Sequence, residues 1–381
     1  MEQKLLYIAS TYSHIRNFHL PYIREFQARG WEVHVACGGA RMEIPEADQV
    51  IHIPFDKSIS FSKNQEALRL LRQTLRAGGY ELVSTHTALA SFFARLAVLG
   101  MKNRPLVACM VHGYLFDEET PMKRKLALSM AERLTAPVTD LVMTMNRWDH
   151  LYASSHHLGK QVCNAPGVGV NFDRLDQTPE TARAELRQEL GLSEDQFAFI
   201  YAAEFSDRKN QETLLRAMAE LPEQAVLLLP GSGAKKAACE ALAKQLGLGD
   251  RVRFPGQITD MNRWYAAADG AVSSSRSEGL PFNIMEAMHC GLPIVASAVK
   301  GHEDLIETEE NGLLYPFGDS KACAWQMKRI LEESALRSRL GEEARQDAEQ
   351  YRLERVLPQV MDCYARILPS LSERAEAART H

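Results

Sequence analysis

Two glutamates eight positions apart form the most informative pattern in the chain. They bound the segment Glu278-Gly-Leu-Pro-Phe-Asn-Ile-Met-Glu286. Gly279 and Pro281 predict a turn leading into a helix, whose first backbone N–H groups are a favourable place for a phosphate or sugar oxygens. An ionised carboxylate has two acceptor oxygens, so Glu286 could hold both hydroxyls of a ribose and Glu278 a sugar hydroxyl. An isolated pair of this kind is usually solvated, but the turn formers and the apolar strand predicted at 293–296 favour a binding site.

Short apolar runs alternate with amphipathic stretches along most of the chain, and these elements must position the two glutamates. Runs rich in β-branched residues predict strands, and the stretches between them predict helices. This alternation is typical of parallel sheets with crossover helices, in which ligands bind at the carboxyl ends of the strands. The predicted helices include 17–29, 63–77 and 88–100, and the predicted strands are 4–9, 32–36, 81–85, 106–111 and 140–144, then 197–203, 225–229, 251–254, 270–273 and 293–296.

The segment 164–173 separates the two series of strands. It contains several small turn-forming residues and is followed by a polar, acidic stretch, which is typical of a linker. At 381 residues the chain is long enough for two domains that each bury a core. We therefore predict an α/β fold with two doubly wound domains, 1–170 and 171–350, that face each other across a cleft, followed by a helical tail, 351–381.

Composition and charge exclude several classes of protein. With 45% hydrophobic and 24% charged residues the chain resembles an ordinary globular protein, and its net charge of −5 argues against nucleic-acid binding. Seven scattered cysteines without a C-x-x-C pair do not indicate a metal site, and most are typical of reduced core residues. No apolar stretch approaches the roughly 20 residues of a membrane span. We therefore expect a soluble, cytoplasmic protein, at most peripheral on the inner face of the cell membrane.

From about 197 to 320 the chain resembles the retaining family 4 glycosyltransferases of the GT-B fold. That family places a glutamate, seven residues and a second glutamate in a pattern that this chain matches with SEGLPFNIMEAMHCGLPIVAS. The similarity extends through LLLPGSGAKK upstream and KGHEDLIETEENGLLYPFGD downstream. The first half, with ASTYSHIRNFHLPYIREFQARGWEVHVA, STHTALASFFARLA and VHGYLF, is similar to members that build bacterial exopolysaccharide and capsule. The resemblance implies two facing Rossmann-like domains with an inter-domain cleft, and C-terminal helices that cross back to the first domain.

The resemblance also implies a set of donor-binding residues in the second domain. Glu286 would bind the donor ribose, and Glu278 and the backbone that follows it would contact the donor sugar and distal phosphate. Two glycines in PGSG would allow close backbone approach near the diphosphate, and the loop 257–258 would lie beside the base. The implied donor-binding residues are Gly231, Gly233, Gln257, Ile258, Gly279, Leu280, Pro281, Phe282, Asn283 and Glu286.

Arg208 and Lys209 lie in the loop after the strand predicted at 197–203. Cleaving a nucleotide-sugar leaves charge on the departing diphosphate, which a metal or fixed cations must stabilise. No Asp-x-Asp metal motif occurs in the chain, so these two residues are the expected cations, and we expect neither a metal nor another cofactor. Lys209 matches the lysine of the family, whereas Glu204 stands where the family usually has an arginine. Arg208 is then expected to be the second cation, although such a pair on a loop could also be solvated.

A histidine that ends a parallel strand points toward the ligand-binding edge of its sheet. His112 follows the strand predicted at 106–111, and the resemblance implies that it lies near the donor sugar and the acceptor. An isolated histidine is more often structural, but the strand end and the glycine after it favour a function. With Lys209, Arg208 and Glu278 it forms the predicted catalytic set. The candidate acceptor or cleft residues are His86, which ends the preceding strand, and Thr11, Ser13 and His14 on the loop after the first strand.

The segment 121–134 is basic and amphipathic. A helix of this kind can lie on an anionic membrane surface, where a lipid-linked acceptor would be found. An ordinary surface helix is the alternative interpretation.

These features predict a retaining glycosyltransferase that transfers a hexosyl or N-acetylhexosaminyl group from a nucleotide diphosphate sugar, with UDP favoured. The expected acceptor is a glycan or a polyprenyl-diphosphate-linked glycan of bacterial cell-surface polysaccharide synthesis. In the family that the chain resembles, the departing phosphate is thought to accept the acceptor proton on the same face. Alternatives are a GT-B epimerase or phosphorylase, and a non-catalytic nucleotide-binding protein, which Glu204 favours. A dehydrogenase is disfavoured because no G-x-G-x-x-G follows the first strand.

Overall fold

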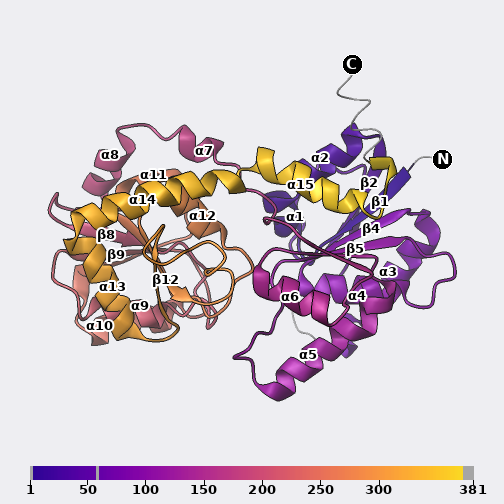
Figure 1. Ribbon diagram of the computed structural model, residues 1–381, viewed down its shortest axis with the longest axis horizontal. Helices are drawn as coiled ribbons and strands as arrows, with labels where there is room; N and C mark the ends of the chain where they lie inside the picture. Colours follow the sequence, from indigo (N-terminus) through magenta and orange to yellow (C-terminus); the bar gives the residue numbers. More distant parts are fainter. Residues whose placement is uncertain (1–2, 57–59, 372–381) are drawn as a thin grey trace. The chain divides into compact units, whose positions relative to one another are not determined.

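Figure 1 shows the computed structural model, which describes residues 3–56 and 60–371. The contacts divide the chain into two compact units. The N-terminal unit comprises residues 1–168 and 354–381, and the C-terminal unit comprises residues 169–353. The first boundary between the units falls within the segment 164–173. Residues 372–381 of the predicted tail lie outside the described residues.

The N-terminal unit is built on seven parallel strands. These are β1 (Gln3–Ile8), β2 (Trp31–Cys37), β3 (Gln49–His52), β4 (Leu82–His86), β5 (Leu106–Val111), β6 (Leu141–Thr144) and β7 (Gln161–Asn164). They lie in the order β3-β2-β1-β4-β5-β6-β7. Strands β1, β5 and β6 are mainly buried apolar residues, as expected for a parallel sheet that helices cover on both faces.

Helices cover both faces of this sheet (Figure 1). They are α1 (Tyr12–Phe18), α2 (Leu20–Ala28), α3 (Gln65–Gly78), α4 (Ala88–Val98), α5 (Met122–Thr135), α6 (Arg147–Ser155) and α15 (Leu353–Ala365), with short 3₁₀ turns at Ser62–Asn64 and Ala136–Val138. On one face, Leu71 of α3 and Phe93 of α4 share a buried cluster with Leu6 of β1. On the other, α2 and α15 meet through Phe26 and Tyr364, whose ring centroids lie 5.2 Å apart. The C-terminal helix α15 is thus part of the N-terminal unit's core.

A disulfide joins Cys163 of β7 to Cys363 of α15, across a sequence separation of 200 residues. It ties the C-terminal helix covalently to the edge of the N-terminal sheet. This pair is the exception to the expectation that most cysteines are reduced core residues. Five other cysteines are free thiols, and Cys290 is the exposed one among them.

The C-terminal unit is built on six parallel strands. They are β8 (Phe197–Ile200), β9 (Ala225–Pro230), β10 (Val252–Gly256), β11 (Gly270–Ser273), β12 (Ile294–Ala298) and β13 (Leu313–Pro316). Their order in the sheet is β10-β9-β8-β11-β12-β13. The strand order reverses direction at the neighbours β8 and β11, and the loops after these two strands are where a doubly wound sheet binds ligands. The two Rossmann-like sheets confirm the predicted fold class.

Helices also lie on both sides of the second sheet (Figure 1). They are α7 (Asp173–Asp176), α8 (Ala182–Glu189), α9 (Gln211–Met218), α10 (Lys236–Gln245), α11 (Met261–Ala267), α12 (Phe282–His289), α13 (Ser320–Glu332) and α14 (Ser334–Ala348), with 3₁₀ turns at Gly249–Arg251 and Glu349–Tyr351. Leu214 of α9 and Met327 of α13 pack into one buried cluster with Leu227 of β9. None of the described helices is long and apolar enough to cross a membrane.

Two differences from the predicted elements have physical reasons. The predicted helix 17–29 is two helices, α1 and α2, which divide at His19. Pro21 lies in the first turn of α2, where its missing N–H is tolerated, but inside one continuous helix it would remove a hydrogen bond. The short strands β3, β7 and β13 are not predicted; they lie at sheet edges, where one side of a strand lacks a neighbour and apolar character is weaker.

Candidate active site

A buried ion triad joins the loops that follow β8 and β11 in the C-terminal unit. Lys209 Nζ lies 2.6 Å from Glu278 Oε1, and Arg208 Nη1 lies 2.7 Å from Glu278 Oε2. Ser275 Oγ donates a third hydrogen bond to the same carboxylate at 2.5 Å. The side chains of Glu278 and Lys209 are 8% and 11% exposed, whereas that of Arg208 is 50% exposed. The structure thus brings together three of the four predicted catalytic residues.

The charge of Glu278 depends on its two basic partners. Burial by itself would raise the pKa of this carboxyl, but the charges of Lys209 and Arg208 outweigh burial and lower the pKa to about 2. Glu278 is therefore ionised at neutral pH, and protein donors already occupy its oxygens. Its contact with a donor sugar stays a prediction; in this structure the carboxylate holds the two cations in place.

The backbone that carries the two cations is held as firmly as their side chains. Ser274 Oγ donates to the carbonyl oxygen of Lys209 at 2.9 Å, and the Tyr201 hydroxyl donates to the same oxygen at 3.3 Å. The Arg276 N–H donates to the carbonyl of Arg208 at 2.7 Å. These bonds bind the loop after β8 to the loop after β11, so the positions of the cations do not depend on a ligand.

His302 supports the triad from within the unit, although no function is predicted for it. The side chain is fully buried. Its Nε2 lies 3.1 Å from Ser273 Oγ, and its Nδ1 lies 2.8 Å from the carbonyl oxygen of Ser297. Burial lowers the pKa of His302 to about 4, so the ring is neutral at pH 7. Next to it, a Cβ on Gly301 would lie 2.8 Å from the Cβ of Glu278, so a larger residue would displace the glutamate.

Glu286 lies in the second turn of α12, and Tyr265 of α11 orients it. The fully buried Tyr265 hydroxyl donates to Glu286 Oε2 at 2.9 Å. Burial raises the pKa of the Glu286 carboxyl, and the hydrogen bond from Tyr265 and the charge of Arg174 only partly offset this effect. Sequence reasoning finds Glu286 but not Tyr265, which lies 21 residues away.

The remaining donor-binding candidates of this segment form the start of α12. Pro281 is the N-cap residue of the helix, and Leu280 and Pro281 are buried. Gly279, Phe282 and Asn283 are partly exposed. The helix N-terminus carries partial positive charge close to Glu278 in sequence, which suits a phosphate or sugar oxygens.

Both glycines of PGSG lie so close to neighbouring backbone that a larger residue would clash with it. A Cβ on Gly231 would lie 2.0 Å from the carbonyl oxygen of Ala203, and a Cβ on Gly233 would lie 2.4 Å from that of Phe205. Both glycines also have φ near 150°. The loop after β9 thus packs against the loop that leads to Arg208, and the proximity of these glycines to a diphosphate stays a prediction.

Two further candidates lie after β10. Gln257 is exposed and Ile258 is partly exposed. Ser232 Oγ lies 3.2 Å from Gln257 Oε1, so this loop reaches the loop after β9. The side chain of Glu204 is exposed as well.

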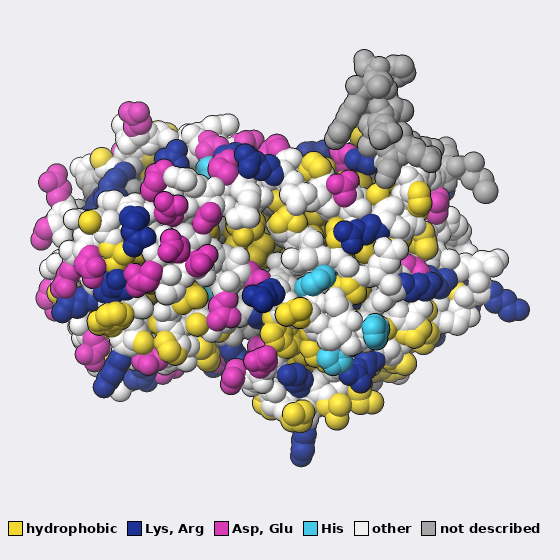
Figure 2. Space-filling model, in the orientation of Figure 1, with side chains coloured by type: hydrophobic (Ala, Val, Ile, Leu, Met, Phe, Trp, Pro, Cys, Tyr) yellow, Lys and Arg dark blue, Asp and Glu magenta, His cyan; other side chains and the backbone are white. Residues whose placement is uncertain are grey.

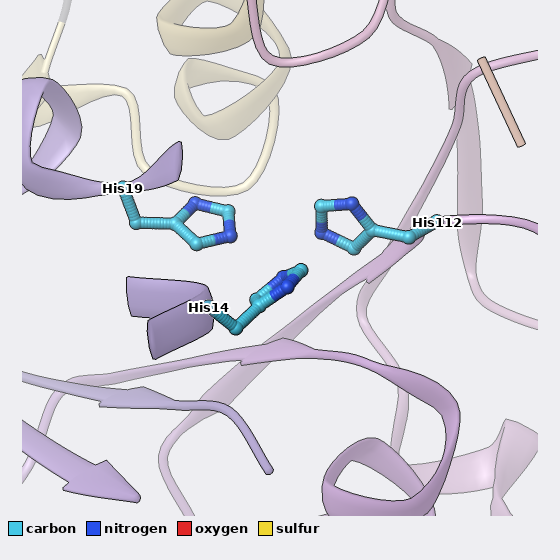
Figure 3. A group of neighbouring side chains, drawn as sticks. All are labelled: His14, His19 and His112. Carbon is cyan, nitrogen blue, oxygen red and sulfur yellow. The ribbon is translucent and has the colours of Figure 1, made fainter. Parts of the chain in front are cut away.

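The N-terminal unit gathers four histidines at the carboxyl ends of its central strands. His14 lies in α1, His86 ends β4, and His112 follows β5. The structure brings these predicted residues together and adds His19, which lies in the quoted Phe-His-Leu-Pro segment but has no predicted role. Ring centroids of His14 and His112 lie 4.7 Å apart, and those of His19 and His86 lie 4.1 Å apart. Figure 3 shows the rings of His14, His19 and His112 facing one another.

The histidines of this cluster are neutral at pH 7. Burial lowers the pKa of His14 to about 4. It lowers the pKa values of His19, His86 and His112 well below their ordinary value, and the charges of neighbouring histidines add to the effect. His86 Nδ1 lies 3.3 Å from His112 Nε2, and His86 Nε2 lies 3.0 Å from Ser84 Oγ. The cluster can therefore accept hydrogen bonds or bind a metal ion, but it is a poor source of protons.

The other two candidates lie at the start of α1: Thr11 caps the helix, whereas Ser13, like His14, lies within it and not on the predicted loop. Thr11 is the N-cap residue of α1, and its Oγ1 accepts a hydrogen bond from the N–H of His14 at 3.2 Å. Ser13 is exposed, and its Oγ lies 3.1 Å from Thr11 Oγ1. Thr11 thereby fixes the helix that carries His14.

Comparison with known proteins identifies the family. Residues 22–170 match the family described as Glycosyltransferase Family 4, and residues 182–347 match Glycosyl transferases group 1. EpsD of Bacillus subtilis (strain 168), whose name assigns it to the glycosyltransferases, is 32% identical over 370 residues, which cover 96% of this chain and 97% of EpsD. The chain belongs to the family 4 glycosyltransferases. The D-inositol 3-phosphate glycosyltransferase of Xylanimonas cellulosilytica is 31% identical and covers 90% of this glycosyltransferase, with 89% of its own length.

Solved structures agree on the fold. HepE of Anabaena, determined with UDP and glucose, has a TM-score of 0.79 at 20% identity and covers 96% of this glycosyltransferase and 100% of its own chain. Sucrose-phosphate synthase of Thermosynechococcus elongatus has a TM-score of 0.80 at 24% identity, with coverage of 97% and 100%. The glycosyltransferase has the GT-B fold, as predicted.

We predict that Glu278→Gln destabilises the C-terminal unit by about 3 kcal/mol at pH 7, because two cations lose a buried partner. The folded pKa of about 2 lies below the unfolded value, so the stabilisation is present above about pH 4.5 and is lost as the pH falls toward 2. Urea denaturation at pH 7 and pH 3 should show the difference between wild type and variant shrinking at the lower pH. The exposed Glu303→Gln is the control, and an equal loss in both variants would contradict the prediction.

Proposed function

We propose that this glycosyltransferase transfers a hexosyl or N-acetylhexosaminyl group, with retention, from a UDP-sugar to a glycan or polyprenyl-diphosphate-linked acceptor. The observation that carries the proposal is the ion triad: two cations share one carboxylate, so one unit of positive charge is left for the diphosphate. The name of EpsD supports the transfer activity, and the UDP complex of HepE supports UDP as the nucleotide.

In this proposal the triad stabilises the leaving group. When the bond to the sugar breaks, negative charge develops on the distal phosphate of UDP. Arg208 transfers part of its hydrogen bonding from Glu278 to that phosphate, Lys209 supplies a fixed positive charge beside it, and the N-terminus of α12 faces the same anion. Because the loops are already bound to each other, little reorganisation is needed at the moment of reaction.

Glu286 is proposed to bind the donor ribose. Tyr265 occupies one carboxylate oxygen and sets the orientation of the group. An ionised carboxylate with an oxygen still available can accept a hydrogen bond from a ribose hydroxyl. This hydrogen bond recognises the nucleotide without taking part in bond cleavage.

The neutral histidines of the N-terminal unit are proposed to act on the acceptor. A neutral imidazole accepts a hydrogen bond from a sugar hydroxyl and so can orient it, with His112 in this role. In the proposed retaining mechanism the departing phosphate takes the hydroxyl proton on the same face of the sugar. The histidines then orient the acceptor and need not change charge.

We predict that Lys209→Ala and Glu286→Ala lower kcat/KM by about 100-fold or more, since each removes a charged contact with the donor. Tyr265→Phe should mainly raise KM for the donor, because the carboxylate remains but loses its orienting bond. Turnover is measured as UDP release with UDP-sugars and a lipid-linked acceptor. The exposed Lys244→Ala is the matched control. Near-normal turnover in the two alanine variants would refute the site, and an epimerised sugar formed without acceptor would favour an epimerase.

We further predict that transfer survives treatment with EDTA, because Lys209 and Arg208 supply the charge that a metal would supply at the diphosphate. The measurement is the initial rate before and after chelation, with a known Mg²⁺-dependent glycosyltransferase as the control. A rate that falls with EDTA and returns only with a divalent cation would contradict a metal-independent reaction.

We propose that α5 lies on the membrane surface that carries the acceptor. Met122, Leu126, Met130 and Leu134 recur every four residues and are 76%, 58%, 60% and 53% exposed. They form one apolar stripe, because residues four apart lie on the same face of a helix. Basic residues accompany the stripe in the same helix, and Figure 2 shows hydrophobic and basic side chains together over α5 at the lower edge of the N-terminal unit.

We predict that Leu126→Glu combined with Met130→Glu lowers binding to vesicles containing anionic lipid by about tenfold or more, since both changes remove apolar contact and add repulsion. Co-sedimentation with vesicles measures the effect. Leu151→Glu is the matched control, because Leu151 is 58% exposed on α6 of the same unit. Equal binding of the α5 variant and wild type would identify α5 as an ordinary surface helix.

A further inference from the structure

Three histidines from separate segments converge in the N-terminal unit. They are His14 of α1, His19 at the junction of α1 and α2, and His112 after β5. One ligand nitrogen from each lies within 4.8 Å of the other two. Figure 3 shows the three rings directed toward a common point. His19 is fully buried, whereas His14 and His112 are partly exposed.

Two of these nitrogens are buried without a hydrogen-bond partner. Among the described residues, His14 Nε2 and His19 Nε2 contact no donor or acceptor. A buried polar atom that stays unpaired costs free energy, so it indicates that a ligand completes the site. His112 Nε2 has only a long contact, 3.3 Å, with His86 Nδ1, which a stronger bond could replace.

A hydrogen bond at Nδ1 of His19 can set the tautomer in which Nε2 is free to bind a metal ion. The Tyr7 hydroxyl lies 2.9 Å from His19 Nδ1 and is buried. When Nδ1–H donates to this oxygen, the proton is on Nδ1 and the lone pair is on Nε2, at the common point. Metal-binding histidines commonly make this second hydrogen bond, which sets their tautomer.

We propose that His14, His19 and His112 bind one Zn²⁺ ion through three imidazole nitrogens, with the fourth position open. Three nitrogens at the usual Zn–N distance of about 2.1 Å would lie roughly 3.4 Å apart in a tetrahedral site. From the present spacing, rotation of the side chains moves each nitrogen inward by roughly 1 Å or less. A site of three imidazoles selects Zn²⁺, Co²⁺ or Cu²⁺ over Mg²⁺ and Ca²⁺, which prefer oxygen ligands.

The ion would act as an inhibitor of transfer, and this consequence alone rests on the proposed function. His112 cannot orient an acceptor hydroxyl while its nitrogen holds Zn²⁺. Zn²⁺ should therefore lower the rate and EDTA should restore it. Metal binding itself can be measured without acceptor or donor, so it is decided independently of activity.

The test uses the full-length protein, treated with EDTA, dialysed and titrated with Zn²⁺ in a calorimeter. One saturable site per chain is expected. Co²⁺ should give the visible absorption bands of a tetrahedral complex, and Zn²⁺ should abolish them. Mg²⁺ should give neither heat nor competition.

Two variants assign the site. His14→Gln removes a partly exposed ligand, and His19→Asn removes Nε2 while keeping a polar atom near Tyr7. Each should weaken Zn²⁺ binding by more than the roughly 10- to 100-fold typical of changes behind the ligands. His157→Gln, an exposed histidine of the same unit, is the control and should leave affinity unchanged. Circular dichroism checks that each variant is folded.

Three results would overturn the proposal. They are the absence of a saturable site in the wild type, unchanged affinity in folded His14→Gln, and an equal loss in His157→Gln. Unchanged affinity in folded His14→Gln would mean that the histidines only make hydrogen bonds. An equal loss in His157→Gln would mean that Zn²⁺ binds to surface residues only.

Discussion

The site of the C-terminal unit depends on the ion pairs that the buried Glu278 carboxylate makes with two basic residues. Removal of a carboxylate from water is costly unless cations and hydrogen bonds replace the solvent. Lys209 and Arg208 provide that replacement at 2.6 and 2.7 Å, and they follow β8 whereas Glu278 follows β11. The same ion triad therefore closes two loops of neighbouring strands against each other. Tyr201 and Ser275 complete it from within the core, so the cations are in place before a ligand arrives.

The histidine cluster of the N-terminal unit is neutral, in contrast to the charged triad of the C-terminal unit. Among the described residues no carboxylate is paired with its clustered histidines, and burial and mutual repulsion keep these rings neutral. The positive charge of Lys209 and Arg208 suits a diphosphate, whereas the lone pairs of the neutral imidazoles suit a sugar hydroxyl or a metal ion. The division between charged and neutral groups follows from what surrounds each side chain, not from its residue type: His302 is neutral beside a triad, and His112 is neutral among histidines.

Continuous apolar runs make the central strands predictable, and the ranges 106–111 and 270–273 coincide with β5 and β11. The break between α1 and α2 could have been read from Pro21, but the helical periodicity on both sides hides it. Glu278 and Lys209 can be found from the family pattern, yet their pairing cannot, because it joins residues 69 positions apart. His19 and Tyr265 are missed for a related reason. Tyr265 contacts Glu286, 21 residues away, and His19 meets His86 and His112 only in the folded chain. Such contacts have no local spacing that can be detected in the sequence.

The family that the sequence resembles usually has an arginine where this chain has Glu204, but the proposed diphosphate site need not lack a second cation. The Glu204 side chain is exposed, so it is screened by solvent and does not enter the triad. Arg208 and Lys209 also differ in solvent exposure: the Lys209 side chain is 11% exposed and the Arg208 side chain is 50% exposed. Moving the buried lysine away from Glu278 would leave the buried carboxylate with only the half-exposed Arg208 as its cation. Arg208 can turn from Glu278 toward a phosphate at lower cost, because water already reaches its guanidinium and Lys209 still neutralises the carboxylate. The physical asymmetry of the triad thus favours Arg208 as the mobile clamp and Lys209 as the fixed charge.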